Sequence, residues 1–120
     1  FNRTATGEYK TMMGAGIQEA IEAVKNAGAH VIGTNCGNGF DQMVEIVAEI
    51  REFDPDTPVL VHANAGLPEV LNGETVYPET AEIMAAKVPA LMQSGADIIG
   101  GCCGTTPEHI RRIAEVVRKG

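Results

Sequence analysis

Apolar residues recur every three or four positions in four segments of the chain, which predicts four amphipathic helices. Their core positions are Ile17, Ala20, Ile21 and Val24; Phe40, Met43, Val44, Val47 and Ile50; Ala81, Met84, Ala85, Val88, Leu91 and Met92; and Ile110, Ile113, Ala114 and Val117. The first helix should stop at Asn26-Ala27-Gly28 and the second at Asp54-Pro55-Asp56. Pro89 should bend or shorten the third helix. Thr106 is the predicted N-cap of the fourth, with Pro107 at its first helical position.

Short apolar runs between these helices predict three buried strands. They are Val31-Ile32-Gly33, Val59-Leu60-Val61 and Asp97-Ile98-Ile99-Gly100. The segment from Asn64 to about Pro78 is polar and rich in Gly and Pro, so it predicts a long loop. Strands that alternate with helices imply right-handed βαβ units and a parallel sheet, which places the chain in the α/β class.

An internal repeat refines this prediction. The segment Asn26–Gly37, NAGAHVIGTNCG, resembles Gln93–Gly104, QSGADIIGGCCG, and Cys36 falls opposite Cys103. The two copies are two βα units apart, with the strand at Val59 between them. Such repetition suits a (β/α)8 TIM barrel, in which active sites lie past the C-terminal ends of the strands.

The length indicates only half of such a barrel. The chain has 120 residues, whereas a complete barrel has about 250. Three strands are predicted, with Phe1-Asn2 as the tail of a fourth. We therefore predict the C-terminal half of a TIM barrel, with residues 1–120 as a single partial domain. Its open strand edges favour pairing with a missing N-terminal half-barrel or self-association, and because Phe1 is not an initiator residue we expect a cut or trimmed N-terminus.

Composition and charge narrow the class of partner. The chain is 44% hydrophobic and has a formal net charge of -7, which argues against nucleic-acid binding and against docking on anionic membranes. No apolar run approaches the roughly 20 residues that span a bilayer, and no signal peptide is recognisable. Three cysteines cannot all pair, and adjacent cysteines form a disulfide only with strain. We therefore expect a cytoplasmic protein with reduced thiols.

The cysteines are the strongest candidates for chemistry. Cys36, Cys102 and Cys103 follow strands that point the same way, so their sulfurs should meet at one end of the barrel. Thiolates suit Zn²⁺, and three protein ligands leave a fourth coordination position open, which is typical of a catalytic zinc. Such a zinc would hold a substrate thiol as thiolate for attack on an alkyl donor.

Three other interpretations of these residues remain open. Cysteines are commonly small buried hydrophobic residues that only pack in the core. A zinc could also have a purely structural role and hold together the strands of a non-catalytic module. Glycines before a helix start also bind phosphate in barrels. The phosphate interpretation explains Gly100, Gly101, Gly104 and Thr105 but gives no role to Cys36.

The remaining polar residues carry weaker signals. His62 lies in a buried strand and is predicted to be a hydrogen-bonded core or rim residue, while His30 and His109 are predicted at the surface. Asn64 ends a strand, where it serves as a weak oxygen ligand, a substrate contact or a turn former. Acidic residues on the outer helix faces should be solvated: Glu19, Glu22, Glu45, Glu49, Glu82 and Glu115.

The motifs GTNCGNG, VHANAGLPE and GGCCGTTPEHIR resemble the homocysteine S-methyltransferase family, whose members include the homocysteine-binding domain of cobalamin-dependent methionine synthase. The resemblance runs from about Thr11 to Val117 and covers the C-terminal half of the family's barrel. It implies a zinc bound by Cys36, Cys102 and Cys103, with the sulfur of homocysteine as fourth ligand and methionine as product. It also implies that Asn64 holds the vacant zinc position without substrate, and that backbone groups around Asn35 and Cys36 contact the bound amino acid.

The resemblance also suggests a branch of the family. TGEYKTMMGAG and NAGLPE are closer to the cobalamin-dependent branch than to the betaine-dependent one, which implies methylcobalamin as donor, delivered by a methyl-donor domain elsewhere. The family's first strand, with its Asp-Gly opening, is absent from this chain, so the fragment alone is expected to be inactive.

Overall fold

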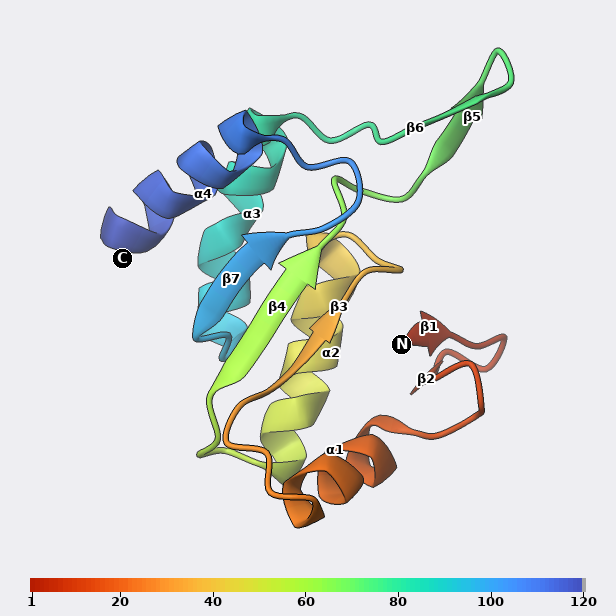
Figure 1. Ribbon diagram of the computed structural model, residues 1–120, viewed down its shortest axis with the longest axis vertical. Helices are drawn as coiled ribbons and strands as arrows, with labels where there is room; N and C mark the ends of the chain where they lie inside the picture. The colour runs from red at the N-terminus through yellow and green to blue at the C-terminus, as the bar shows by residue number, and fades with distance from the viewer. Residues whose placement is uncertain (120) are drawn as a thin grey trace.

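The computed structural model describes residues 1–119 and has a three-stranded parallel sheet at its centre (Figure 1). Its strands are β3 (Ile32–Asn35), β4 (Val59–Ala63) and β7 (Ile98–Gly101), in the order β3-β4-β7. Asn35 pairs with His62, and His62 with Gly100. The three strands therefore end at one level, which confirms the predicted parallel α/β arrangement.

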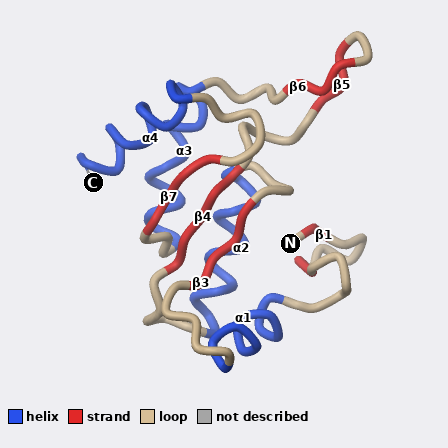
Figure 2. Tube along the Cα trace, in the orientation of Figure 1, coloured by secondary structure: helices blue, strands red, loops and turns tan. Residues whose placement is uncertain are grey.

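The four predicted helices are present. They are α1 (Ile17–Asn26), α2 (Phe40–Phe53), α3 (Ala81–Ser94) and α4 (Pro107–Lys119). In Figures 1 and 2, α2 and α3 lie behind the sheet, α1 lies below it and α4 lies beyond β7. The core lies between α2, α3 and the sheet, and its fully buried larger side chains are Phe40, Met43, Ile46, Val47, Ile50, Val59, Val61, Met84, Val88 and Leu91. Burying this apolar surface supplies the main driving force for the fold.

The opposite face of the sheet is open. In β4, Val59, Val61 and Ala63 are buried while Leu60 and His62 are only half-buried, as expected when alternate side chains point to opposite faces. Ile98 of β7 is 43% exposed. Both β3 and β7 have one neighbour in this sheet, so each leaves an edge unpaired among the residues that the structure describes.

Two predictions about irregular segments are wrong. Phe1-Asn2 is not the tail of a fourth parallel strand, because β1 (Asn2–Arg3) pairs antiparallel with β2 (Tyr9–Lys10). Tyr9 anchors this hairpin by donating a hydrogen bond to Glu45 on α2. The segment predicted as a loop from residue 64 to 78 contains a hairpin of β5 (Glu69–Leu71) and β6 (Glu74–Val76).

The turn of the second hairpin explains why that strand pair forms. Asn72 and Gly73 have φ of 52° and 81°, which is the left-handed conformation that Asn-Gly adopts in two-residue hairpin turns. The hairpin projects away from the sheet (Figure 1), and Val70 is 73% exposed.

The last two helices correct smaller predictions. α3 continues past Pro89 to Ser94, so the proline does not shorten it. In α4, Ile113 is buried as predicted, but Ile110 is 45% exposed and His109 is buried. The helix packs against α3, and the ring of His109 is hydrogen-bonded to the carbonyl of Glu79. Thr106 caps α4 as predicted, since its hydroxyl accepts a hydrogen bond from the backbone N–H of His109 at 3.4 Å.

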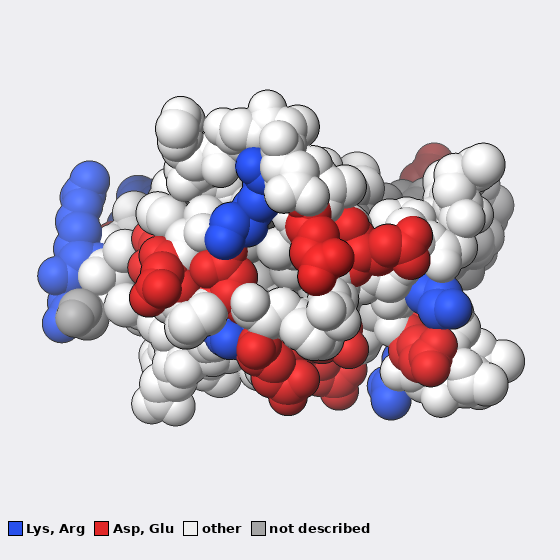
Figure 3. All heavy atoms as spheres, turned by 90° about the horizontal axis from the view of Figure 1, so that it is seen from below, with Lys and Arg blue, Asp and Glu red and all other residues white. Residues whose placement is uncertain are grey.

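Groups of carboxylates lie across the middle of the face seen in Figure 3. Glu19 and Glu22 are exposed as predicted, whereas Glu49 is only half-buried, and burial raises the pKa of its carboxyl. Among the described residues, none of the helices combines the length and apolarity that crossing a bilayer requires.

A buried carboxylate closes the connection between α2 and β4. Asp54 accepts hydrogen bonds from the backbone and hydroxyl of Thr57 and from the backbone of Asp56. It also pairs with Lys25 of α1 at 2.6 Å. These contacts, led by Lys25, hold the pKa of Asp54 well below its usual range. The end of α1 is therefore tied to the turn that leads into the central strand.

We expect Asp54→Asn to lower the free energy of unfolding by about 2 kcal/mol at pH 7, because it removes the negative charge that Lys25 and the hydrogen-bond donors of Asp56 and Thr57 stabilise. The folded state holds the Asp54 proton less tightly than the unfolded state, whose carboxyl titrates near pH 4. The advantage of the wild type is therefore complete above about pH 4 and declines as the pH falls towards the lower folded pKa.

Urea unfolding at pH 7 and pH 2.5 measures this difference, with the exposed Asp56→Asn as the control. A gap between wild type and Asp54→Asn that is equally large at both pH values would contradict the expectation.

Candidate metal centre

The cysteines lie where the outer strands of the sheet end. Cys36 follows β3, and Cys102 and Cys103 follow β7. The backbone N–H of Cys36 donates to the carbonyl of His62 at 2.9 Å, and that of Cys102 donates to Ala63 at 2.8 Å. Both turns are therefore fixed to the central strand β4, one from each side.

This arrangement brings all three sulfurs together. The Sγ atoms of Cys36 and Cys103 are 3.5 Å apart, and those of Cys36, Cys102 and Cys103 all lie within 4.8 Å of one another. Three sulfurs at about 2.3 Å from one tetrahedral zinc would be about 3.8 Å apart. The donor type and its spacing therefore fit a zinc ion. Cys36 and Cys102 are half-buried and Cys103 is exposed.

The turn after β3 has an uncommon backbone conformation. Cys36 has a φ of 57° and Gly37 a φ of 76°. A left-handed conformation costs a non-glycine residue about 1 kcal/mol or more. Because such strain clusters at functional sites, the conformation of Cys36 supports a role for its side chain beyond packing.

The turn after β7 depends on a close approach. Gly104 has a φ of +79°, and a Cβ there would overlap Tyr77. Thr105 holds the same turn from the other side, because its N–H and its hydroxyl both donate to the carbonyl of Cys102, at 3.2 and 2.7 Å. Only glycine satisfies both the backbone conformation and the contact with Tyr77.

Asn64 connects the two cysteine turns. It is 3% exposed, and its backbone N–H donates to the carbonyl of Asn38 in the turn after Cys36. Its Oδ1 accepts a hydrogen bond from the backbone N–H of Cys103 at 3.0 Å, and the next residue, Ala65, donates to the carbonyl of Cys103 at 2.9 Å. Asn64 thus lies beside the sulfurs and positions them, while its roles as fourth ligand and substrate contact stay predictions.

Asn35 and the histidines fall in different surroundings. Asn35 is exposed at the end of β3 and is paired in register with His62; its contact with substrate stays a prediction. The half-buried imidazole of His62 lies against Gly100, where a Cβ would be 2.7 Å from the ring. His30 is exposed as predicted. The prediction for His109 is wrong, because this residue is 8% exposed.

Electrostatic effects differ between the thiols. A hydrogen bond with Cys103, followed by one from the backbone of Gly37, lowers the pKa of Cys36. Burial raises the pKa of Cys102. Burial also raises the pKa of Tyr77, and the neighbouring Cys103 raises it further.

The backbone at the start of α4 offers little to a phosphate. The N–H of Thr105 donates to Cys102, that of Thr106 to Nδ1 of His109, and that of Cys103 to Asn64. These three donors already have partners within the chain, which weakens the phosphate interpretation at Thr105.

Tyr77, Glu79 and His109 contact the cysteine turns or their supports and were not predicted as site residues. Tyr77 and Glu79 come from the segment after the β5–β6 hairpin, whose path the sequence does not reveal. For His109 a signal exists, because it follows the N-cap Thr106 by three positions, which is the spacing of a capping box.

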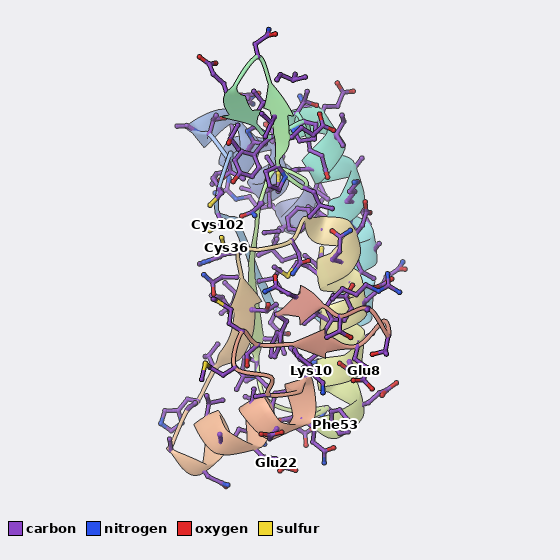
Figure 4. All side chains as sticks on the ribbon, turned by 90° about the vertical axis from the view of Figure 1, so that its right-hand side faces the viewer. Glu8, Lys10, Glu22, Cys36, Phe53 and Cys102 are labelled. Atoms are coloured by element: carbon purple, nitrogen blue, oxygen red, sulfur yellow. The ribbon has the colours of Figure 1, made fainter. Side chains whose placement is uncertain are left out.

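A surface pocket lined by Glu8, Lys10, Glu22 and Phe53 lies near α1, away from the sulfurs (Figure 4).

Comparisons with known proteins point to one family. A family model described as homocysteine S-methyltransferase matches residues 2–117. Methionine synthase from Mycobacterium leprae (strain TN) is 36% identical over 109 residues, which cover 90% of this chain and 9% of that protein. Methionine synthase from Mycobacterium tuberculosis (strain ATCC 25618 / H37Rv) is 37% identical over 110 residues, covering 88% of this chain and 9% of that protein.

A solved structure has the same fold. The oxidized form of the homocysteine methyltransferase MmuM from Escherichia coli matches 85% of this chain and 30% of its own, with a TM-score of 0.62 and 24% identity. The chain thus spans about a tenth of the length of the methionine synthases that it matches.

We expect Gly104→Ala to lower the free energy of unfolding by about 3 kcal/mol, because it combines a left-handed φ with overlap against Tyr77. Gly14→Ala is the matched control, since Gly14 has a φ of +86° with nothing within 4 Å of the added Cβ. That substitution should cost only about 1 kcal/mol.

A double-mutant cycle with Tyr77→Gly isolates the contact from the backbone cost, because the added Cβ at position 104 would overlap the Cβ as well as the ring of Tyr77. In the Tyr77→Gly background, Gly104→Ala should cost no more than Gly14→Ala does. The same large cost with and without the Tyr77 side chain would show that overlap is not the cause.

Proposed function

Because the chain belongs to the homocysteine S-methyltransferase family, we propose that it forms the C-terminal half of a TIM barrel that binds Zn²⁺ through Cys36, Cys102 and Cys103. The parent protein transfers a methyl group to the sulfur of homocysteine and yields methionine. The observation that carries this proposal is the convergence of three sulfurs, from strands two apart, to within 4.8 Å of one another.

The open face of the sheet supports the half-barrel. In a closed barrel this face points inward and is filled by side chains from the other strands. Here Leu60 and His62 are half-buried on it, and Ile98 is 43% exposed. The unpaired edges of β3 and β7 are the places where further strands would add. Residues 1–120 are thus one partial domain whose partner is the N-terminal half of the barrel.

A zinc bound by three thiolates carries a formal charge of -1, so the chemistry that it supplies is capture of the substrate thiol as thiolate. The chain's own contribution is to hold the three sulfurs close together and to leave one side of the sulfur cluster accessible to substrate. Cys103 is exposed, so the substrate sulfur approaches from the side of this residue. The amino-acid part of homocysteine lies near the exposed end of β3 at Asn35.

Asn64 has a positioning role in this proposal. Its Oδ1 already accepts the hydrogen bond from Cys103, and a carbonyl oxygen has a second lone pair. It therefore keeps the Cys102–Cys103 turn in place and would be a weak fourth ligand of a bound zinc when substrate is absent. Its hydrogen bond to Cys103 does not depend on that second role.

The methyl donor comes from outside this chain. The resemblance of TGEYKTMMGAG and NAGLPE to the cobalamin-dependent branch favours methylcobalamin, presented by a separate methyl-donor domain. The chain alone supplies the sulfur ligands but not the other half of the barrel, so we expect methyl transfer only in the complete protein, in the cytoplasm.

Metal analysis tests the proposal directly. The reduced parent protein should bind one Zn²⁺, and Cys36→Ser, Cys102→Ser and Cys103→Ser should each lower the affinity by at least about a hundredfold, because each removes one of three thiolates. Ser substitution at Thr34, which is also buried on β3, is the control. Absence of stoichiometric zinc from the reduced wild type would end the zinc mechanism.

Thiol titration separates a catalytic zinc from its rivals. A chelator should make the three thiols reactive while the circular dichroism spectrum changes little. Thiols that react slowly with or without chelator would indicate simple packing, and loss of the folded spectrum on chelation would indicate a stapling zinc.

A further inference from the structure

The structure assigns a positioning role to His109: its imidazole locks the segment after β4 onto the start of α4 and thereby fixes the Cys102–Cys103 turn. The residue lies in the first turn of α4, where its exposed neighbours Glu108 and Ile110 face solvent. His109 itself is 8% exposed. The effect of His109 on zinc affinity rests on the function proposed above, whereas its effect on the cysteine turn does not.

One ring nitrogen completes a capping box. Nδ1 of His109 lies 2.8 Å from the hydroxyl of Thr106 and accepts the backbone N–H of Thr106 at 3.2 Å. The Thr106 hydroxyl in turn accepts the backbone N–H of His109. This is the reciprocal arrangement in which Glu or Gln normally serves at the third helical position. Since Nδ1 accepts from an N–H, it carries no proton, so Nε2 carries it.

The other ring nitrogen makes a contact that a normal capping box lacks. Nε2 lies 2.8 Å from the backbone carbonyl of Glu79, to which it donates. The backbone N–H of Glu79 donates to Ala65 at 3.0 Å, and the N–H of Ala65 donates to Cys103 at 2.9 Å. His109 is thus connected to Cys103 through two residues of the segment after β4.

Chain connectivity closes this series of contacts into a ring. From Cys103 the chain continues through Thr105, which donates twice to Cys102, to Thr106 and back to His109. The cysteine turn is therefore held between two supports that His109 joins. Without the imidazole, the helix start and the segment after β4 are no longer fixed to each other at this point.

Glu79 extends the effect to the other cysteine turn. Its carboxylate pairs with Lys87 at 3.0 Å and packs against Gly39 and Gly66, where added Cβ atoms would approach it to 3.3 and 2.8 Å. Gly39 ends the turn that contains Cys36, and Gly66 follows Asn64 and Ala65. A displaced Glu79 backbone would therefore loosen both sides of the sulfur cluster.

Two substitutions at this position separate the link from the cap. His109→Gln keeps an acceptor for Thr106 and an N–H donor for Glu79. His109→Asn keeps the acceptor near the position of Nδ1 but is too short to reach Glu79. Ile113→Val, at a buried position of the same helix, is the control for a modest loss of stability that leaves the link intact.

Amide hydrogen exchange in the intact, reduced, metal-free protein tests the link without any metal. We expect His109→Asn to accelerate exchange at Ala65 and Cys103 at least about tenfold relative to Val61 in the central strand, because the turn opens locally. His109→Gln and Ile113→Val should stay within about threefold of wild type. Equal exchange in His109→Asn and His109→Gln, or an Ile113→Val effect as large as that of His109→Asn, would overturn the role.

Zinc affinity, measured by chelator competition, gives the second readout. Loss of a residue that orients metal ligands typically costs ten- to a hundredfold in affinity, so His109→Asn should bind Zn²⁺ about tenfold more weakly and His109→Gln nearly as wild type. If zinc affinity simply followed thermal stability across the three variants, that result would contradict the positioning role of His109. A wild type that binds no zinc refutes the proposed function, while the exchange experiment still decides the role of His109.

Discussion

The parallel register of β3, β4 and β7 is the constraint on which the site depends. Neighbouring strands lie about 4.8 Å apart, so the ends of β3 and β7 are separated by about 10 Å. The sulfurs that follow them nevertheless lie within 4.8 Å of one another. Both turns must therefore lean over the end of β4, and a slip of one residue in either pairing would turn the cysteines away from each other.

The leaning turns are held by backbone polar groups rather than by apolar packing. The end of β4 supplies carbonyls to Cys36 and Cys102 from His62 and Ala63. Asn64 then supplies a side-chain acceptor to Cys103 and a backbone donor to the opposite turn. Because these groups are buried or half-buried, leaving one unpaired would cost about 1–3 kcal/mol. This cost keeps the three sulfurs close together.

Periodicity and the internal repeat were enough to predict the helices, the sheet and the common level of Cys36 and Cys103, since these follow from local pattern and parallel connection. What escaped prediction depends on contacts between distant segments. The burial of His109 follows from the carbonyl of Glu79, thirty residues earlier, and the contact of Tyr77 with Gly104 depends on the path taken after the β5–β6 hairpin. The Asn72-Gly73 turn was a readable hairpin signal in a segment whose composition suggested only a loop.

The sulfur cluster is formed entirely by this chain, whereas one face of its sheet is left uncovered. All three cysteines and their supporting hydrogen bonds come from one sheet and the turns on it, so the donor set needs no residue from elsewhere. The face below it still exposes Leu60 and Ile98 in part, and such a face gains stability only when further strands cover it. Under the function proposed above, metal affinity would be a local property of these turns, whereas recognition of the remainder of the substrate would require a surface that covers the open face.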